Sequence, residues 1–323
     1  MTKTAWMFPG QGSQAPGMGR QLLEEYPVAR QILERAEQAS GLPLEQLRRR
    51  GPTSSLSRPS VAEPLITAIS IGYVEALRSH GFHPDCVAGY SAGEVAAFYA
   101  AGVLSLEQAI EVAVIRGRLF EEYCSTESRM VTIAGVAIET VSDILGQLSA
   151  SDPQVYIAAQ NGLRHTTIVG DEQCVLAAEE RLSRLGAEIS QVNVGGKWHS
   201  IHLAPATEIL VKKLSKQTFL PPACPILTSA SAEFRSSPRD LIVDLSAGVS
   251  RPVMWRQIVK KLDEFGVNQF YECGSGRVLF GLMRWNEDQL GAYEAVCVED
   301  RNYGLRPLKR LAQQKTASEG MHE

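Results

Sequence analysis

The sequence predicts an α/β fold into which a smaller, ferredoxin-like unit is inserted. Strand-like and helix-like patterns alternate through most of the 323 residues, as in proteins whose helices pack on a parallel sheet. Between about residues 129 and 195 the order changes to β-α-β-β-α-β, which is typical of the ferredoxin-like arrangement. The composition, 44% hydrophobic and 21% charged, indicates a globular protein of about two domains and excludes disordered, collagen-like and coiled-coil chains.

The segment before the insertion contains strands and helices that proline, glycine and capping residues delimit. An apolar strand ends at Pro9-Gly10, because these residues stop a strand in a turn. Ser105 to Gln108 has the form of a capping box, which favours the start of a helix. The predicted elements are strands at 4–8 and 86–90 and helices at 18–40 (broken at Pro27), 64–80, 92–101 and 105–123.

The insertion and the segment after it complete the predicted organisation. Within the insertion, strands are expected at 130–136, 155–160, 166–170 and 189–194, and helices at 138–148 and 171–186. Helices and strands of the body resume after Gly195, including segments 201–215 and 263–273. We therefore divide the chain into a larger body, 1–128 and 196–312, an inserted unit, 129–195, and a polar tail, 313–323, that is expected to fray.

Charge and hydropathy exclude several classes of function. The formal net charge is -4, with 32 Lys and Arg against 36 Asp and Glu, so we expect no nucleic-acid partner. No run approaches the ~20 apolar residues that span a bilayer, and the N-terminus lacks the apolar core of a signal peptide, so no membrane partner is expected. Six scattered cysteines without a CxxC pair indicate reduced thiols in a cytoplasmic protein.

The clearest local signal is the GxSxG pattern Gly89-Tyr90-Ser91-Ala92-Gly93. It favours a sharp strand-to-helix turn that presents the serine Oγ, with glycines where side chains would clash with the neighbouring strand and helix. The pattern is common by itself, and an ordinary tight turn with a surface serine is the alternative. The strand-like residues before it and the helix-like residues after it favour the nucleophile.

A nucleophilic serine needs a base, and His199 is the best candidate. It follows a strand and two glycines, a loop-to-helix junction of the kind that displays functional residues. A structural histidine is the alternative. His199 and His202 could also ligate a metal from one helical turn, but no nearby Cys or carboxylate completes such a site, so we predict no metal.

Arg116 is the third informative residue. It falls on the inward, apolar stripe of the helix that begins at Leu106, whereas Arg118 points away. A guanidinium cannot stay unpaired in a core. It therefore meets either an internal carboxylate or the carboxylate of a ligand, and from the residues alone the internal partner is favoured.

Together these residues resemble a known family. Phe8-Pro9-Gly10-Gln11-Gly12-Ser13-Gln14 followed by Gly17-Met18-Gly19 is similar to the N-terminal signature of malonyl-CoA:acyl-carrier-protein transacylases and of polyketide-synthase acyltransferase domains. Further matches, in family order from residue 5 to about 285, are Gly89 to Glu94, Ala101 to Leu104, Arg116-Gly117, Asn161, His199-Ser200, Arg251 to Val253 and Glu272 to Leu279. The resemblance implies an α/β-hydrolase-like large subdomain with an inserted ferredoxin-like subdomain.

The resemblance implies a two-step transfer through an acyl-serine. Ser91 would attack an acyl thioester with His199 as general base, and the backbone N–H groups of Gln11 and Ala92 would hold the oxyanion. The backbone carbonyl of Met254 would orient the histidine. No bound cofactor is implied: coenzyme A thioesters and the 4'-phosphopantetheine of an acyl carrier protein are substrates.

The resemblance also implies a substrate pocket, in which several positions of this chain depart from the family. Arg116 corresponds to an arginine that grips the carboxylate of malonyl or methylmalonyl groups, and Asn161 to a polar group beside the site. Tyr90 stands where histidine is usual, Ala92 leaves space beside the serine, and Trp198 narrows the room for an α-substituent.

Glu63 stands where the family usually has glutamine, and its carboxylate has three possible roles. Its carboxylate could pair with Arg116 and compete with a malonyl carboxylate. It could face the acyl chain and bind an amine of an aminoacyl or peptidyl unit. It could also point to solvent at a helix start, where acids are favourable.

The sequence therefore predicts an acyltransferase that loads an acyl unit onto an acyl carrier protein in fatty-acid or polyketide synthesis. Malonyl is the favoured acyl unit, and a discrete, trans-acting polyketide enzyme is the favoured type. The alternatives are transfer of a non-malonyl unit between carrier proteins, hydrolysis of acyl-carrier proteins, and a non-catalytic binding module. Carrier proteins are usually acidic, so a basic docking surface is expected. The candidates are Lys197, Arg301 and Arg306, for which a solvated helix face is the alternative.

Overall fold

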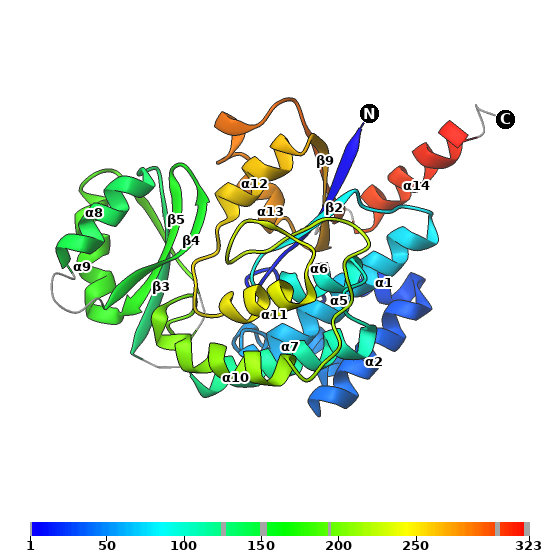
Figure 1. Cartoon of the computed structure of the whole chain (residues 1–323), viewed down its shortest axis with the longest axis horizontal. Coiled ribbons are helices and arrows are strands. Elements are labelled where there is room, and N and C mark those ends of the chain that lie inside the picture. The colour runs from blue at the N-terminus through cyan, green and yellow to red at the C-terminus, as the bar shows by residue number, and fades with distance from the viewer. Residues whose placement is uncertain (1, 124–126, 149–153, 193–194, 301–303, 320–323) are drawn as a thin grey trace.

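The protein consists of a larger body and a smaller lobe at one end (Figure 1). The computed structural model describes residues 2–123, 127–148, 154–192, 195–300 and 304–319. The body is built on a six-stranded sheet and the lobe on a four-stranded sheet. This is the predicted fold class, an α/β body with an inserted antiparallel unit, and it is confirmed.

The sheet of the body has the order β10-β9-β1-β2-β7-β8. Its strands are β1 (Lys3–Phe8), β2 (Cys86–Gly89), β7 (Ile226–Leu227), β8 (Phe234–Arg235), β9 (Val267–Ser275) and β10 (Glu294–Glu299). All neighbouring pairs are parallel except β7 with β8. Phe8 of β1 pairs with Gly89 of β2, so the loops that follow these two strands emerge side by side at the carboxyl edge, where α/β proteins place their sites.

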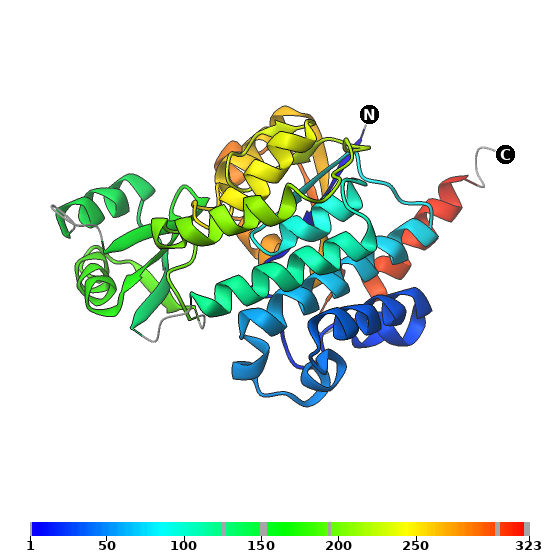
Figure 2. The ribbon, with the colours of Figure 1, turned by 60° about the horizontal axis from the view of Figure 1, so that its bottom comes forward.

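Helices cover both faces of this sheet. They are α1 (Arg20–Glu25), α2 (Pro27–Ser40), α3 (Leu44–Arg50), α4 (Thr53–Leu56), α5 (Pro59–Ser79), α6 (Gly93–Ala100), α7 (Leu106–Glu122), α10 (Ala204–Leu214), α11 (Pro238–Ala247), α12 (Trp255–Glu264), α13 (Val278–Met283) and α14 (Arg306–Glu319), with 3-10 turns η1 (Ile201–Leu203) and η2 (Glu287–Gln289). Side chains of β1 alternate between the two cores: Trp6 and Phe8 join one, Ala5 and Met7 the other. Figure 2 shows α7 crossing the body toward the lobe beside α10.

Helix α5 lies at the centre of the body. It is the only helix in the described ranges that is long and apolar enough to cross a membrane, and 89% of its apolar window is buried inside the protein. It begins at Pro59, five residues before the predicted start at Pro64, because proline at the first helical position suits a helix start. Pro64 removes one backbone bond inside the helix, and burial on all sides maintains the helix there.

The C-terminal segment, expected to fray, is helical as far as Glu319. The helix is α14, and it is anchored by the buried side chains of Leu305, just before its start, and of Leu308 in its first turn. Further along, the Lys315 ammonium lies 4.8 Å from the centre of the Phe82 ring, a favourable cation–π contact. The polar composition of this segment did not indicate that it packs on the body, because only a few apolar contacts hold the helix there.

The smaller lobe follows the predicted β-α-β-β-α-β order. Its elements are β3 (Ser128–Ala134), α8 (Ile138–Leu148), β4 (Val155–Gly162), β5 (His165–Asp171), α9 (Glu172–Ser183) and β6 (Glu188–Gln191). The antiparallel sheet has the order β4-β5-β3-β6 and its own apolar core. Strand β4 attaches to the body, because Val253 exchanges backbone hydrogen bonds of 2.9 and 2.8 Å with Ala158 and Gln160.

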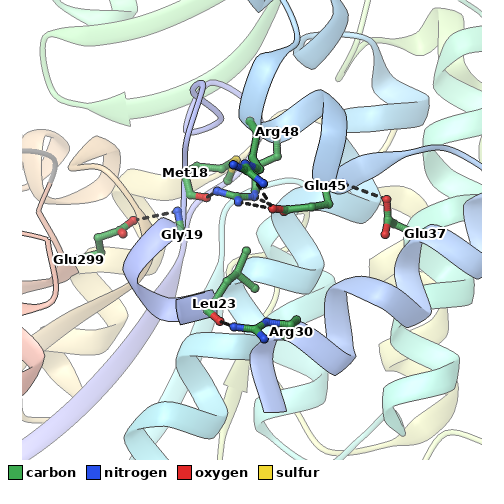
Figure 3. A network of polar contacts seen from close by, with 9 residues as sticks. Met18, Gly19, Leu23, Arg30, Glu37, Glu45, Arg48 and Glu299 are labelled. Carbon is green, nitrogen blue, oxygen red and sulfur yellow. Dashed lines mark hydrogen bonds and ion pairs between the residues drawn. The ribbon is translucent and has the colours of Figure 1, made fainter. Parts of the chain in front are cut away.

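A network of polar contacts fixes the chain between β1 and α1 (Figure 3). The buried Arg48 donates to the Met18 carbonyl at 2.8 Å and to both carboxylate oxygens of Glu45. Glu299 accepts from the N–H of Gly19 at 3.3 Å. These contacts hold one end of the loop that carries Gln11, and β1 holds the other.

Close packing of α5 against α7 depends on a glycine. A Cβ added to Gly117 of α7 would lie 2.6 Å from the carbonyl oxygen of Pro59, at the start of α5. Contacts this short are repulsive, so only glycine permits the approach. The same approach brings Glu63 of α5 to Arg116 of α7.

We predict that Gly117→Ala destabilises the protein by about 1–3 kcal/mol, because overpacking outweighs the better helix propensity of alanine. Gly146→Ala is the matched control: Gly146 is also helical, but no atom lies within 4 Å of its added Cβ. We expect that control to stabilise by about 0.5–1 kcal/mol. Urea unfolding followed by circular dichroism measures both, and equal effects of the two variants would contradict the packing argument.

Candidate active site

Ser91 lies on a sharp turn between β2 and α6. Its φ is 52°, a left-handed conformation that costs a non-glycine residue energy and that is frequent at functional sites. A Cβ on Gly89 would lie 2.3 Å from the backbone N of Glu94, and one on Gly93 2.0 Å from the carbonyl oxygen of Phe8. Both glycines are therefore required for the reason that the sequence suggested, and the turn presents the serine side chain.

The hydroxyl of Ser91 is hydrogen-bonded to His199. Its Oγ lies 2.9 Å from Nε2 of the imidazole. The other ring nitrogen, Nδ1, lies 2.8 Å from the carbonyl oxygen of Gly248 and 3.2 Å from that of Arg251. Because carbonyls only accept, Nδ1 carries the proton and Nε2 is left to accept from the serine. This arrangement can transfer the serine proton to the imidazole as the oxygen attacks an electrophile.

The carbonyls that hold the imidazole are not the one that the resemblance implied. Met254 was expected to orient His199, and this prediction is wrong. The Met254 carbonyl accepts the first helical hydrogen bond of α12, from the N–H of Ile258 at 3.0 Å. The Nδ1 proton is already shared between the carbonyls of Gly248 and Arg251, so residues before the helix supply the acceptors instead.

The imidazole is electrically neutral at ordinary pH. Burial, and to a smaller extent the positive charge of Arg116, lowers the pKa of His199 to about 4, although the two carbonyl acceptors act in the opposite direction. A buried site disfavours the imidazolium because the charged form loses its hydration. The base is therefore available to accept a proton throughout the neutral range.

The loop after β1 contacts the serine turn directly. A Cβ on Gly10 would lie 2.3 Å from the carbonyl oxygen of Tyr90 and 3.3 Å from Cβ of Ser91. The next residue, Gln11, lines the same pocket as the serine, and its side chain is held by the Ser57 carbonyl at 2.7 Å. The N–H groups of Gln11 and of Ala92, at the start of α6, remain the predicted oxyanion donors.

Comparison with known proteins agrees with this geometry. A model of the acyl transferase domain family matches residues 5–267, a range that holds both the serine and the histidine. The chain belongs to the acyl transferase family. A malonyl CoA-acyl carrier protein transacylase from Bacillus subtilis strain 168 is 31% identical over 286 residues, which cover 88% of this chain and 90% of the relative.

Solved structures of related enzymes share the fold of this acyltransferase. An acyl carrier protein S-malonyltransferase from Vibrio cholerae superposes with a TM-score of 0.87 at 28% identity, covering 96% of this chain and 100% of that one. A malonyl-transacylase solved in complex with a type II polyketide synthase acyl-carrier protein superposes with a TM-score of 0.88, also at 28% identity and with the same coverage. The body and the inserted lobe of this acyltransferase thus have solved counterparts.

In this acyltransferase Arg116 forms an internal ion pair with Glu63. Its Nε lies 3.1 Å from Oε2 and its Nη2 lies 3.4 Å from Oε1 of the carboxylate. The side chains are 0% and 2% exposed. Of the interpretations left open by the sequence, pairing with Arg116 is confirmed, and a solvent-facing Glu63 is wrong. The Nη1 atom of Arg116 is buried and has no hydrogen-bond partner.

The other predicted substrate residues line a pocket of about 220 Å³ beside Ser91. The Tyr90 hydroxyl donates to Oδ1 of Asn161 at 2.8 Å, and Nδ2 of Asn161 donates to Oγ1 of Thr167 at 3.0 Å. Burial raises the pKa of Tyr90, so the phenol stays neutral. Trp198 is 4% exposed and packs on Phe120 with ring centres 5.3 Å apart, which fixes one wall of the pocket.

Of the predicted docking residues that the structure describes, neither Lys197 nor Arg306 lines this pocket. Lys197 forms an ion pair with Asp171 at 2.5 Å, so its charge is already partnered. Arg306 lines a separate cavity, beside Arg20 and Asp300. Arg301 lies outside the described residues. Within the described ranges, no group of three or more His, Cys, Asp or Glu side chains could hold a metal ion.

The sequence did not assign a role to Glu94, although it belongs to the serine motif. Its Oε1 accepts from the N–H of Ser229 at 2.7 Å, and the carbonyl of Ser229 accepts from the N–H of Met254 at 2.9 Å. Its Oε2 would lie 3.0 Å from a Cβ on Gly248, whose carbonyl holds His199. Burial raises the pKa of Glu94 to about 7. This carboxyl group therefore supports the segments that orient the base.

We predict that the reactivity of Ser91 is flat from about pH 5 to pH 8 and falls about tenfold per pH unit below about pH 4, because His199 loses its function as a base only when protonated. Arg116→Gln removes a positive charge that lowers the pKa of His199, so the acid limb moves to higher pH. The rate of Ser91 labelling by a fluorophosphonate, followed by mass spectrometry, measures the profile.

Arg118→Gln is the matched control for that charge effect, because Arg118 lies on the same helix but is exposed. We expect it to leave the acid limb in place. A wild-type limb near the ordinary histidine pKa of about 6.5 would contradict the argument from burial.

Proposed function

We propose that the protein is an acyl-carrier-protein S-acyltransferase that carries its acyl unit on Ser91. The observation that carries the proposal is the 2.9 Å contact between Ser91 Oγ and Nε2 of His199 in a chain of the acyl transferase family. Relatives named as malonyl CoA-acyl carrier protein transacylases support a thioester donor. A relative solved with a type II polyketide synthase acyl-carrier protein supports that class of acceptor, and thus a role in fatty-acid or polyketide synthesis.

In the first step, Nε2 of His199 takes the hydroxyl proton while Oγ of Ser91 attacks the thioester carbonyl carbon. The N–H groups of Gln11 and Ala92 hold the oxyanion of the tetrahedral intermediate. The carbon–sulfur bond then breaks, the thiolate takes the proton from the imidazolium, and an ester on Ser91 remains.

The second step is the reverse reaction with a new thiol. The phosphopantetheine thiol of the carrier protein gives its proton to His199, and its sulfur attacks the serine ester. The carbon–oxygen bond breaks, and Ser91 regains a proton from the imidazolium. Both steps exchange only a carbon–sulfur bond of a thioester and a carbon–oxygen bond of the serine ester. Coenzyme A and phosphopantetheine therefore act as substrates, and no bound cofactor is part of the proposal.

Two classes of acyl unit suit this chemistry. The names of the relatives favour a malonyl unit. The internal pairing of Arg116 with Glu63 favours a unit without a carboxylate, which would be passed between carrier proteins. We place the enzyme in the cytoplasm as a discrete, trans-acting acyltransferase; the five cysteines in the described ranges are free thiols, as a reducing compartment requires.

We predict that Ser91→Ala forms no acyl adduct with any thioester, because the ester oxygen is gone, and that His199→Ala slows acylation by about 100- to 10,000-fold. Intact-protein mass spectrometry after brief incubation with acyl-coenzyme A esters or acyl-loaded carrier protein measures the adduct. Ser142→Ala, an exposed serine on α8, is the control and should be acylated like the wild type.

The same experiment separates transfer from the alternatives. Addition of a second carrier protein should move the adduct to its phosphopantetheine thiol. Release of free acid without transfer would instead establish a hydrolase, and an unchanged activity of Ser91→Ala would establish a role without this serine.

A further inference from the structure

The buried ion pair of Arg116 and Glu63 neutralises a positive charge near the acyl pocket, although neither residue lines that pocket. Both groups are almost fully buried, and both oxygens of Glu63 accept from the guanidinium, at 3.1 and 3.4 Å. The pair is held in place by the α5–α7 contact at Gly117. Because the two charges cancel, Arg116 does not act as an isolated cation toward a substrate.

The pair lies close to the reacting groups. The Arg116 guanidinium lies over the ring of Phe120, 5.5 Å from its centre, and Phe120 packs on the pocket residue Trp198. The positive charge of Arg116 acts on His199. A carboxylate on an acyl unit at Ser91 would therefore meet a neutralised ion pair instead of a free cation, and their attraction would not offset the loss of its hydration.

The pocket itself provides no compensating cation. Among its lining residues in the described ranges, none is Asp, Glu, Lys or Arg. Burial lowers the pKa of the lining His165 to about 4, so this imidazole is also neutral. Much of the remaining wall is apolar and includes Met130, Val192, Val278 and Leu282.

One donor of the ion pair remains unused. Nη1 of Arg116 is buried without a partner, and a buried donor without an acceptor is costly. An ammonium group would find no free carboxylate, because Glu63 is held by Arg116.

We propose that Glu63 is a specificity-determining residue that directs this acyltransferase to uncharged acyl units and against units with a free carboxylate or a free amine. The inference rests on the proposed function, because it describes the acyl unit that Ser91 carries. N-acylated aminoacyl, ketoacyl and alkanoyl units belong to the favoured class.

The test compares three acyl groups of similar length that differ in charge: malonyl, acetoacetyl and β-alanyl. In acetoacetyl a methyl group replaces the carboxylate oxygen of malonyl. Each is supplied as the coenzyme A and as the pantetheine thioester, because the pantetheine arm is common to coenzyme A and carrier proteins. The initial rate of Ser91 acylation is measured by intact-protein mass spectrometry for the wild type, Glu63→Gln and the exposed control Glu139→Gln.

We expect the wild type to take acetoacetyl at least about 10-fold faster than malonyl or β-alanyl, which corresponds to a modest charge penalty. In Glu63→Gln, Arg116 becomes an unneutralised cation, so the malonyl-to-acetoacetyl rate ratio should rise by about 10- to 100-fold. Glu139→Gln should leave the ratio unchanged. Faster malonyl transfer by the wild type, or an unchanged ratio in Glu63→Gln, would overturn the specificity proposal and leave the transferase function standing.

A second variant covers the case in which Glu63→Gln does not fold with Arg116 unpaired. The double variant Glu63→Gln/Arg116→Gln keeps the site neutral, and we expect it to retain the preference for acetoacetyl; a preference for malonyl would contradict the proposal. If none of the thioesters acylates Ser91 while the fluorophosphonate still labels it, the proposed function fails, and the specificity proposal fails with it.

Discussion

The active site depends on the direct contact between the two chain turns that follow β1 and β2. The pairing of Phe8 with Gly89 aligns the ends of the two strands, and the N–H of Tyr90 donates to the Phe8 carbonyl at 2.9 Å. Gly10 and Gly93 then allow backbone to approach backbone without side chains between. The strained nucleophile and the loop that carries Gln11 are thus held by the pairing of β1 with β2. The relative position of Ser91 and the Gln11 loop is therefore set by the fold and does not require a bound substrate.

The electrostatics of the site follow from burial rather than from added charges. The histidine is held by two backbone carbonyls instead of a carboxylate, so its partners are dipoles with no net charge. Arg116 adds a nearby positive charge that Glu63 largely cancels. The result is a base that stays neutral and a pocket that presents little net charge. Such a site favours chemistry in which charge appears only transiently, on the oxyanion and on the imidazolium of His199.

The sequence predicted those features whose cause is local. The glycines around Ser91, the capping box at Ser105 and the strand order of the lobe are set by neighbouring residues, and the structure agrees with each. Features set by distant segments were not predictable in the same way. Met254 was chosen by analogy, whereas the path of the chain before α12 brings other carbonyls to the imidazole. Glu63 and Arg116 are 53 residues apart, and only helix packing selects among the possible partners of each.

The order of strands in the body has a consequence for synthesis of the chain. β1, made first, lies between β2 and β9, and its partner on one side begins only at Val267. At about 5–20 residues per second, roughly 13 to 50 s pass before that strand leaves the ribosome. During this time the central strand exposes an unpaired apolar edge, whereas the inserted lobe, whose strands lie close together in sequence, can already close. The growing body is therefore the part of this protein whose strand edge is open to aggregation during synthesis.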